Sequence, residues 1–335
     1  MLSANKNSDM NHPVWDTQSE IRPLPLVVIV GPTGVGKTEL SIQLALHLNG
    51  EIVSADSRLF YREMDIGTAK PGLEDRALVP HHLIDVADPD QVWSLAMFQK
   101  AAMQAIQAIQ TSGHLPFLVG GTGQYVRAIV DGWALPEVKP HPKLRSALEH
   151  WAEEITPQGL HDRLRILDAS SAERIDARNL RRTIRALEVI LTTGKRFSEQ
   201  RGQQKNLYHT CTLGLFQPRD ELYKRIDIRI EKMIEAGLVS EVQSLLNRGY
   251  SPDLPTLSAI GYHEIIDHLS GKFSLDEAVE QMKRRTRIFV RRQANWFKIT
   301  DPNIHWYDAQ HLSHDQIMQD IRYWLDKYRH AYDQA

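Results

Sequence analysis

The chain is very poor in cysteine. Cys211 is the only cysteine among 335 residues, so no disulfide can form within the chain and no zinc site can be built on cysteines. Long apolar runs are also missing, and the longest near the start, residues 26–30, is far too short to span a bilayer. The first residues are polar, with no apolar core for a signal peptide. We therefore expect a cytoplasmic protein without membrane association, and a flexible tail over residues 1–22.

A large excess of charge of one sign is absent too. Lysine and arginine number 40 against 42 aspartates and glutamates, which gives a formal net charge of −2. This balance excludes an obvious polycation of the histone kind, but it leaves nucleic-acid binding open because local charge matters more than the sum. Hydrophobic residues at 42% and charged residues at 24% exclude a disordered chain, a collagen-like repeat and a coiled-coil rod. The length indicates about two domains.

Apolar runs that end in glycine-rich or polar turns recur along the chain. Residues 26–30, 51–55 and 115–119 are typical of buried parallel strands, 93–110 have helical periodicity, and 210–216 alternate as a further strand would. Strands that alternate with helices predict an α/β fold, with ligands bound beyond the carboxyl ends of the strands. After a proline-rich loop at 135–142, only helices are expected to about residue 201.

The turn after the first strand matches G-x-x-x-x-G-K-[ST] at every position and precedes a helical pattern. Glycines let backbone N–H groups surround a phosphate, and the helix N-terminus adds partial positive charge. The lysine can reach the outer phosphates, and the final hydroxyl can ligate Mg²⁺. A site for a diphosphate or longer polyphosphate is therefore predicted at Gly31, Pro32, Thr33, Gly34, Val35, Gly36, Lys37 and Thr38.

The acidic strand end that a kinase or ATPase of this architecture needs for its metal is hard to find. The strand at 115–119 ends in glycines, and Asp85 after a short apolar pair is a weak substitute. The loop could thus hold a diphosphate that leaves. Two alternatives stay open at this point: an ATP-dependent kinase of a nucleotide or small molecule, and an RNA-binding ATPase module.

Two further groups of residues each have a chemical and a structural interpretation. Asp56 at a strand end could act as a base or hold a metal, and a turn or N-cap role has equal weight. Arg225 and Arg229, four residues apart, could clamp an anion, while Asp227 and Glu231 make surface ion pairs the equal alternative.

Basic residues gather in two places. One run contains no acid and has aromatic residues interleaved, so that an anionic partner such as nucleic acid is favoured over a solvated face. The other is one face of a predicted helix, opposite Leu180, Ile184, Leu187 and Leu191. The adjacent His81 and His82 point to opposite faces of a strand and predict no metal site. The basic residues are Lys283, Arg284, Arg285, Arg287, Arg291, Arg292 and Lys298 in the run, and Arg178, Arg181, Arg182 and Arg185 on the face.

Taken in order, several motifs resemble the tRNA dimethylallyltransferases. The similarity covers about residues 24–300, and the block 64–71 together with the phosphate loop is highly specific to that family. Its motifs lie at 31–38, 56–58, 64–71, 81–85, 120–123, 185–188, 260–262, 286–287, 292–293 and 296.

The resemblance implies a P-loop NTPase-like parallel sheet flanked by helices, with an inserted all-helical domain. The expected bounds are 23–136 for the first part of the core, 137–205 for the insertion, 206–300 for the second part with its basic helix, and 301–335 for a helical tail. It implies transfer of the dimethylallyl group from dimethylallyl diphosphate to N6 of the adenosine next to the anticodon, position 37 of tRNA, with Mg²⁺ as cofactor. The partner is the tRNA anticodon stem-loop, and a monomer is expected.

By the same resemblance, Asp56 is the general base, Lys37 and Arg225 assist catalysis, and Thr38 holds the metal. Thr33, Lys37, Thr38, Arg225 and Arg229 contact the diphosphate. Leu59 stands where the family often has glutamine, and Asn295 replaces a usual threonine. The residues expected to contact tRNA are Asp56, Ser57, Arg58, Leu59, Thr122, Arg145, Arg181, Arg182, Arg185, Gly261, Tyr262, Arg291, Arg292, Gln293 and Trp296.

Overall fold

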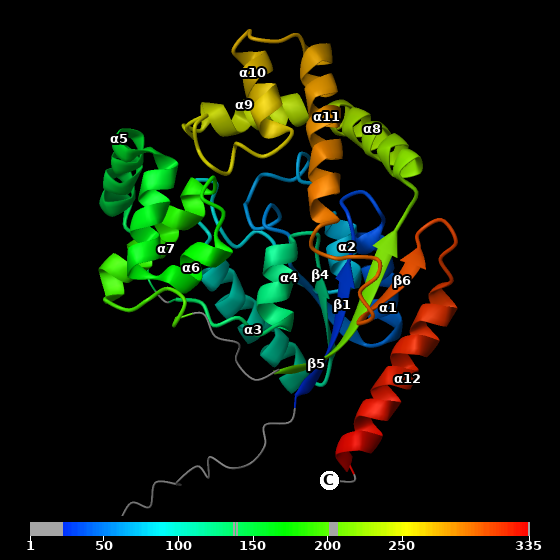
Figure 1. The fold of residues 1–335 in the computed structure, drawn as a ribbon. Helices are drawn as coiled ribbons and strands as arrows, with labels where there is room; N and C mark the ends of the chain where they lie inside the picture. Colours follow the sequence, from blue (N-terminus) through cyan, green and yellow to red (C-terminus); the bar gives the residue numbers. More distant parts are fainter. Residues whose placement is uncertain (1–22, 137, 139, 201–206, 334–335) are drawn as a thin grey trace, which may run out of the picture.

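A parallel sheet with helices on both faces forms the centre of the molecule (Figure 1). The structure, a computed structural model, describes residues 23–136, 138, 140–200 and 207–333, so the predicted flexible tail 1–22 lies outside the described residues. Within them, six strands make one sheet in the order β3-β2-β4-β1-β5-β6, and every pair is parallel. The predicted α/β class is confirmed. The strands are β1 (Leu24–Val30), β2 (Gly50–Ser54), β3 (His81–His82), β4 (Leu115–Val119), β5 (Tyr208–Phe216) and β6 (Ile304–Asp308).

The central strands are apolar on both faces, as strands covered by helices on both sides must be. Residues 26–30 of β1 are 0% exposed, and β4 is buried along its whole length. Because β1 pairs with both β4 and β5, its carboxyl end lies in the middle of the sheet. The loop that follows β1 is therefore placed at the centre of the edge where parallel-sheet proteins bind ligands.

Two strands were not predicted, and one of them changes the domain description. β6 lies inside the segment expected to be a helical tail, and it pairs with β5 at the edge of the sheet. The following helix α12 (His314–Asp333) buries Ile317 and Ile321 completely and packs near α1, β1 and β5. Residues 304–333 are thus part of the core, and the expectation of a tail at 301–335 is wrong.

The remaining core helices cover the sheet and its carboxyl-terminal edge (Figure 1). Helices α9, α10 and α11 stand above that edge, while α12 runs along the flank of the sheet. In the described chain none of the helices is long and apolar enough to cross a membrane. The helices are α1 (Lys37–His47), α2 (Leu73–Leu78), α3 (Leu95–Thr111), α4 (Gly123–Val130), α8 (Arg219–Glu235), α9 (Leu238–Asn247), α10 (Tyr262–Leu269) and α11 (Leu275–Gln293).

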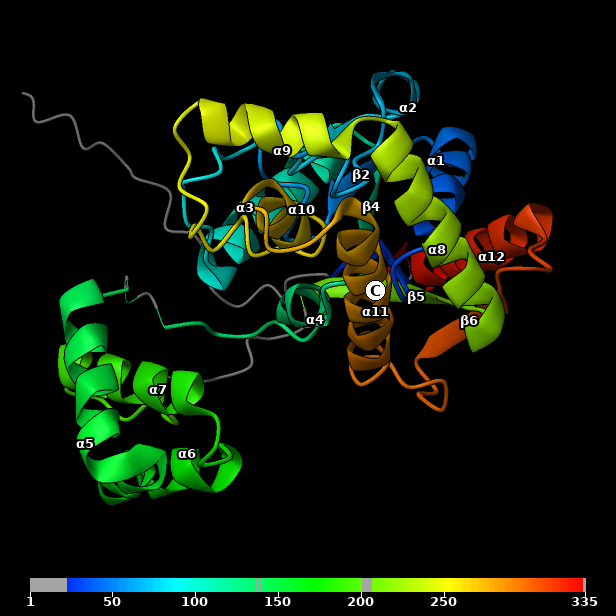
Figure 2. The same ribbon diagram turned by 90° about the horizontal axis from the view of Figure 1, so that it is seen from above.

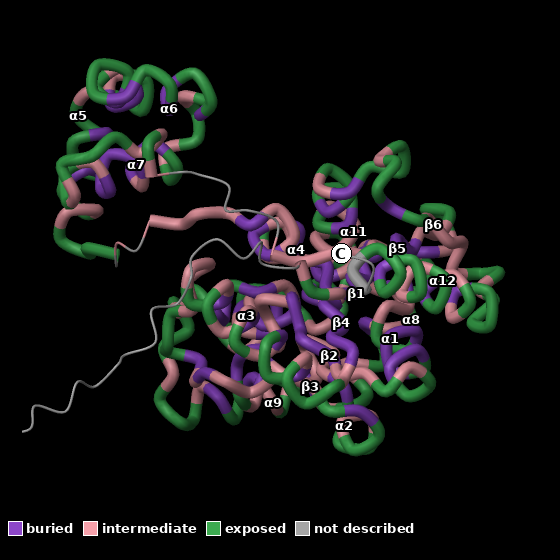
Figure 3. The backbone as a smooth tube through the Cα atoms, turned by 90° about the horizontal axis from the view of Figure 1, so that it is seen from below, coloured by how far each residue is buried: buried purple, intermediate pink, exposed green. Residues whose placement is uncertain are grey.

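A group of helices stands apart from the sheet (Figure 2). It consists of α5 (Pro142–Leu167), α6 (Ala169–Arg174) and α7 (Leu180–Thr193), and α5 is interrupted at Thr156, just before Pro157. These helices bury their apolar faces against one another. Figure 3 shows the buried residues of these helices as purple stretches of the tube. The prediction of Leu191 on the buried face is wrong, because that side chain is 55% exposed near the end of α7. The core of this group is Leu148, Ala152, Leu160, Leu164, Ala172, Ile175, Ile184, Ala186 and Leu187.

Candidate active site

Two adjoining cavities open at the carboxyl-terminal edge of the sheet. The P-loop cavity, about 380 Å³, is lined by the phosphate loop, the start of α1 and residues of α8. The α11 cavity, about 740 Å³, lies below α11 and is lined by side chains of α8, α11 and the loops after β2 and β4. The two cavities share a border, so a ligand in one can reach a ligand in the other. The residues that line both are Thr33, Gly34, Asp56, Thr68 and Arg229.

The phosphate loop has the predicted conformation between β1 and α1. Gly36, the N-cap of α1, has φ 107°, a left-handed conformation that side chains with a Cβ rarely adopt. Gly31 is required for a second reason, since a Cβ there would lie 2.7 Å from the carbonyl oxygen of Leu215 on β5. Val35 of the loop and Leu40 of α1 are buried and anchor the turn to the core.

Lys37 lies inside the loop that it belongs to. Its Nζ donates to the carbonyl oxygens of Gly31 at 3.0 Å and Pro32 at 2.8 Å. Burial lowers the pKa of Lys37 to about 8, with Asp56 acting to raise it and Arg229 to lower it further. The amine is therefore still protonated at neutral pH, and a bound anion would stabilise its charge.

The structure separates the two interpretations of Arg225 and Arg229. The acids near them in sequence are engaged elsewhere: Asp227 pairs with Arg287 of α11, and Glu231 with Lys283 at 3.0 Å. Both arginines line the P-loop cavity instead. The pKa of Arg229 is lowered, mainly by burial. The charge of Asp56 acts to raise it, and the charge of Arg225 acts to lower it. Two guanidinium groups that line one cavity, without acidic partners from their own helix, favour the anion clamp over surface pairing.

Asp56 follows β2 and has the position expected for both of its interpretations. Its Oδ1 accepts from the backbone N–H of Arg58 at 3.1 Å, which is an aspartate turn. The same residue lines both cavities, so its carboxylate is available at their border. Next to it, the N–H of Ser57 donates to Oγ1 of Thr122 at 3.3 Å and joins the loops after β2 and β4.

The remaining expected contacts of these loops also line a cavity. Ser57, Arg58, Thr122 and Trp296 line the α11 cavity. Leu59, which stands where the family that the sequence resembles often has glutamine, lines the P-loop cavity.

Gln293 lines the α11 cavity and is also bonded inside the protein. It is 8% exposed, its Oε1 accepts from the N–H of Thr33 at 2.9 Å, and its Nε2 donates to the carbonyl oxygen of Gly121 at 2.9 Å. The amide therefore bridges the phosphate loop and the loop after β4. These bonds give Gln293 a structural role, and its contact with tRNA stays a prediction.

Gly261 and Tyr262 are also buried. Tyr262 is 0% exposed, and its hydroxyl donates to Oε1 of Glu241 at 2.6 Å, while the N–H of Gly261 donates to Glu264 at 2.7 Å. The polar groups of both residues are thus engaged inside the protein. The motif that carries them has a structural function in the described structure, and their role as RNA contacts stays a prediction.

The basic run on α11 is partly neutralised by acids from other helices. Arg285 pairs with Glu264 and Arg287 with Asp227, so the expectation of a run without acidic partners is wrong for these positions. Arg284, Arg291, Arg292 and Lys298 are exposed, and Arg292 also lines the α11 cavity. The positive surface is therefore narrower than the sequence predicts, and it reaches the α11 cavity at Arg292.

The basic residues of the helical group divide in the same way. Glu188 is 0% exposed and accepts from Arg145 at 2.8 and 2.9 Å and from Arg185 at 2.6 Å. Burial alone would raise the pKa of Glu188, but these hydrogen bonds and one from the His141 backbone lower it to about 2. Arg145 and Arg185 are thus held by an internal carboxylate, while Arg181 and Arg182 are exposed.

Asp85, the weak substitute for the metal-binding acid of a kinase, is engaged in ion pairs. Both carboxylate oxygens of Asp85 are occupied, one by Lys70 and one by Arg76, each at 2.6 Å. Among the described side chains, no group of three or more His, Cys, Asp or Glu could hold a metal. A metal at this site would depend on the exposed hydroxyl of Thr38 and on oxygens of the ligand itself, an arrangement that suits Mg²⁺, which keeps several waters and binds substrate phosphates.

Comparison with known proteins gives one consistent result. The family model described as IPP transferase matches residues 59–300. A tRNA dimethylallyltransferase of Roseiflexus sp. (strain RS-1) is 52% identical over 305 residues, 90% of this chain and 99% of the relative. One from Thermomicrobium roseum is 48% identical over 285 residues, 85% of this chain and 86% of the relative.

Solved structures agree. A tRNA isopentenylpyrophosphate transferase from Bacillus halodurans is 40% identical with a TM-score of 0.67, over 92% of this chain and 98% of the other. A eukaryotic dimethylallyltransferase acting on tRNA is 31% identical with a TM-score of 0.73, over 85% of this chain and 74% of the other. The resemblance found in the sequence is confirmed: the chain belongs to the IPP transferase family.

Proposed function

We propose that this protein transfers the dimethylallyl group from dimethylallyl diphosphate to N6 of adenosine 37, next to the anticodon of tRNA, and releases pyrophosphate. The observation that carries the proposal is the shared border of the two cavities. Cationic groups line one side of that border, and Asp56 lies on the border itself. The larger cavity opens below a helix with exposed arginines.

The P-loop cavity suits a diphosphate leaving group. As the carbon–oxygen bond of the donor breaks, negative charge grows on the departing diphosphate. Lys37, Arg225 and Arg229 line this cavity and can stabilise that charge together with the loop amides. Thr38, on the first turn of α1, would hold Mg²⁺ with the diphosphate oxygens, and the ion would supply further neutralisation.

Asp56 is suited to accept the proton of the acceptor amine. The lone pair of the adenine amino group is delocalised into the ring, so the group is a weak nucleophile until it loses a proton. A carboxylate at the border of the cavities can take that proton while the new nitrogen–carbon bond forms. The backbone bond from Arg58 orients the carboxylate for this task.

The RNA side follows from charge and from access. N6 lies on the Watson–Crick edge, so the base must leave its stack to react, and single-stranded loops allow this most easily. Arg291, Arg292, Arg181 and Arg182 are exposed and can bind phosphates of the anticodon stem. Ser57, Arg58, Thr122 and Trp296 line the α11 cavity, where the base would enter.

The test is incubation of the protein with radiolabelled dimethylallyl diphosphate, bulk tRNA and Mg²⁺, with no ATP. We expect label in RNA, and we expect Asp56→Asn to lose it while still binding both substrates. Phosphoryl transfer from ATP to a substrate, without label in RNA, would instead support the kinase alternative. The monomeric state and the cytoplasmic location stay predictions, to be measured by light scattering and by imaging.

A further inference from the structure

A short loop forms part of the border between the two cavities. Residues 64–71 connect the region after β2 to α2, and Thr68 in this loop lines both cavities. Gly67 lines the α11 cavity, whereas Ala69 lines the P-loop cavity. The position of this loop therefore determines the shape of the passage where donor and acceptor would meet.

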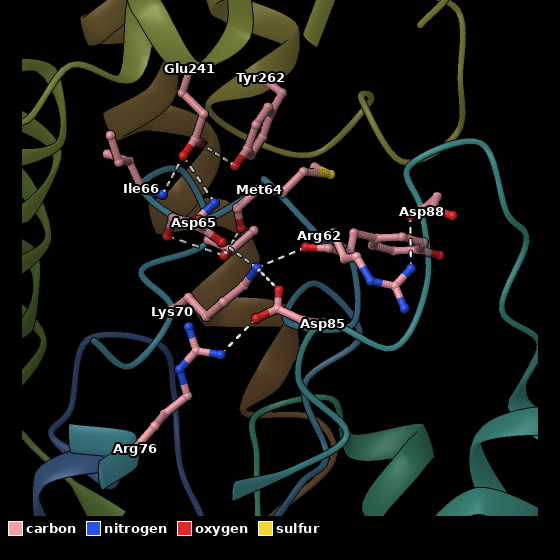
Figure 4. A network of polar contacts seen from close by, with 12 residues as sticks. Arg62, Met64, Asp65, Ile66, Lys70, Arg76, Asp85, Asp88, Glu241 and Tyr262 are labelled. Carbon is pink, nitrogen blue, oxygen red and sulfur yellow. Dashed lines mark hydrogen bonds and ion pairs between the residues drawn. The ribbon is translucent and has the colours of Figure 1, made fainter. Parts of the chain in front are cut away.

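One carboxylate from the second half of the chain holds this loop (Figure 4). The backbone N–H groups of Asp65 and Ile66 donate to Oε2 of Glu241 on α9 at 3.0 and 2.7 Å, and that of Gly67 donates to Oε1 at 3.1 Å. Successive backbone N–H groups that converge on one point make an anion-binding concavity. Here the protein fills that concavity with its own carboxylate.

Tyr262 completes the arrangement from the other side. Its hydroxyl donates to Oε1 of Glu241 at 2.6 Å, which orients the carboxylate toward the loop. Its ring lies against Gly67, where an added Cβ would be 2.5 Å from a ring carbon. The buried tyrosine and the carboxylate thus fix the loop by contact and by hydrogen bonds together.

The loop needs such fixing because its backbone is strained. Glu63, just before the loop, and Ala69, within it, have φ 63° and φ 49°, left-handed values that cost free energy for residues with a Cβ. Such conformations persist only where the surroundings hold them. On its other side the loop is held by Lys70, whose Nζ donates to the carbonyl oxygen of Tyr61 at 2.8 Å and to Asp85 at 2.6 Å.

We propose that Glu241 is a positioning residue for the transfer reaction. It holds the 64–71 loop in its strained shape, and the loop in turn fixes the border at which the donor is placed against the acceptor. The proposal rests on the proposed function. Helix α9 lies outside the phosphate loop and the basic helix. The proposal gives it control over the placement of the donor and no part in the affinity for RNA.

The test compares Glu241→Gln with Arg248→Ala. The carboxylate of Glu241 accepts four hydrogen bonds, two at each oxygen. In a glutamine one of these oxygens becomes an NH₂ group, so in either orientation of the amide that group would face two of the four donors. Arg248, the C-cap residue of α9, pairs with Glu63 just before the loop, but both side chains are exposed at 53% and 39%, so this pair contributes little. It is therefore a matched control on the same helix and loop.

For Glu241→Gln we expect faster amide hydrogen exchange in the peptide that covers residues 64–71. The donor KM should rise and kcat should fall, for a combined loss of about 10- to 100-fold in kcat/KM, because small misplacements of reacting groups cost that much. The Kd for tRNA should stay within about twofold, since binding of RNA phosphates does not use this loop. Arg248→Ala should match the wild type in all four measurements.

Tyr262→Phe keeps the ring against Gly67 and removes only one hydrogen bond, so it should give a smaller change of the same kind. This variant also decides the question if Glu241→Gln fails to fold. Unchanged KM and kcat despite faster exchange would overturn the proposal, and so would equal losses in tRNA affinity and in catalysis. A wild type without transfer activity would refute the proposed function alone, because hydrogen exchange and the donor Kd measured without tRNA still test Glu241.

Discussion

Replacement of Gln293 by leucine should weaken the site without touching any ligand. The change keeps the side-chain volume and removes both hydrogen bonds of the amide, which leaves the N–H of Thr33 and the carbonyl oxygen of Gly121 without partners. A buried backbone group left unpaired costs about 1–3 kcal/mol. For the two groups together the cost is about 2–6 kcal/mol. Both groups lie beside the α11 cavity, where water can replace part of the loss, so we expect about 2 kcal/mol, at the low end of that combined range.

The assay combines thermal unfolding with the donor KM and the tRNA Kd. The melting temperature should fall and the donor KM should rise, because the phosphate loop loses its link to the loop after β4. Gln293→Glu should retain the acceptor for Thr33 but place a carboxylate oxygen against the carbonyl of Gly121, and it should also be destabilised. Asn295→Ala, an exposed position two residues away, serves as the matched control and should change neither stability nor donor KM.

The reasoning would be refuted by a leucine variant with the stability and donor KM of the wild type but with weaker tRNA binding. That result would show that the amide leaves its internal partners to contact RNA. Loss of stability and of donor affinity, with an unchanged tRNA Kd, would support the internal bridge and not an RNA contact.

Three other changes test the site. Asp56→Asn retains an oxygen for the turn bond from the backbone and should lower the single-turnover rate by about 10²- to 10⁴-fold, whereas an unchanged rate would leave only the turn role. Because burial lowers the pKa of Lys37 to about 8, the protonated amine is lost as pH rises through that value, so calorimetric donor affinity should fall between pH 7 and 9. Lys37→Arg should give a flat profile over the same range, and an equal slope in both proteins would exclude Lys37 as the titrating group. Arg291→Ala should reduce the salt dependence of tRNA binding by about 0.7–0.9 log units per log unit of salt. Arg329→Ala on the distant α12 should leave this dependence unchanged. A salt slope for Arg291→Ala equal to that of the wild type would show that Arg291 contacts no phosphate.

The parts of the fold that could be predicted are those determined by local sequence. The strand at 26–30 and the glycine-lysine turn after it follow from an apolar run and from glycines at positions with positive φ. Strands β3 and β6 could not be predicted in this way. Each is a short strand at an edge of the sheet, and residues such as His82 or His305 take extended conformations there because a neighbouring strand offers hydrogen bonds.

Charge was harder to interpret than hydrophobic pattern, for a physical reason. A run of basic residues shows how much charge a helix carries, but the acids that neutralise it come from elsewhere. Arg285 is matched by Glu264 of α10 and Arg287 by Asp227 of α8, at separations of 21 and 60 residues. Only the packing of three helices brings these groups together. The prediction of an anionic partner therefore rests on the exposed positions and not on the whole run.

The motifs located the important residues, but they could not distinguish a residue that touches a ligand from one that holds another residue in place. Both kinds are constrained by the same site, since a catalytic group is useful only at a fixed distance and angle. Burial and hydrogen bonding separate the two kinds of residue in the structure. Asp56 lines both cavities and Arg292 lines the larger one. Tyr262 is completely buried, and Gln293, which also lines the larger cavity, has both ends of its amide bonded to backbone groups. The polar atoms of Tyr262 and Gln293 therefore point back into the protein, where they fix the loops that form the cavities.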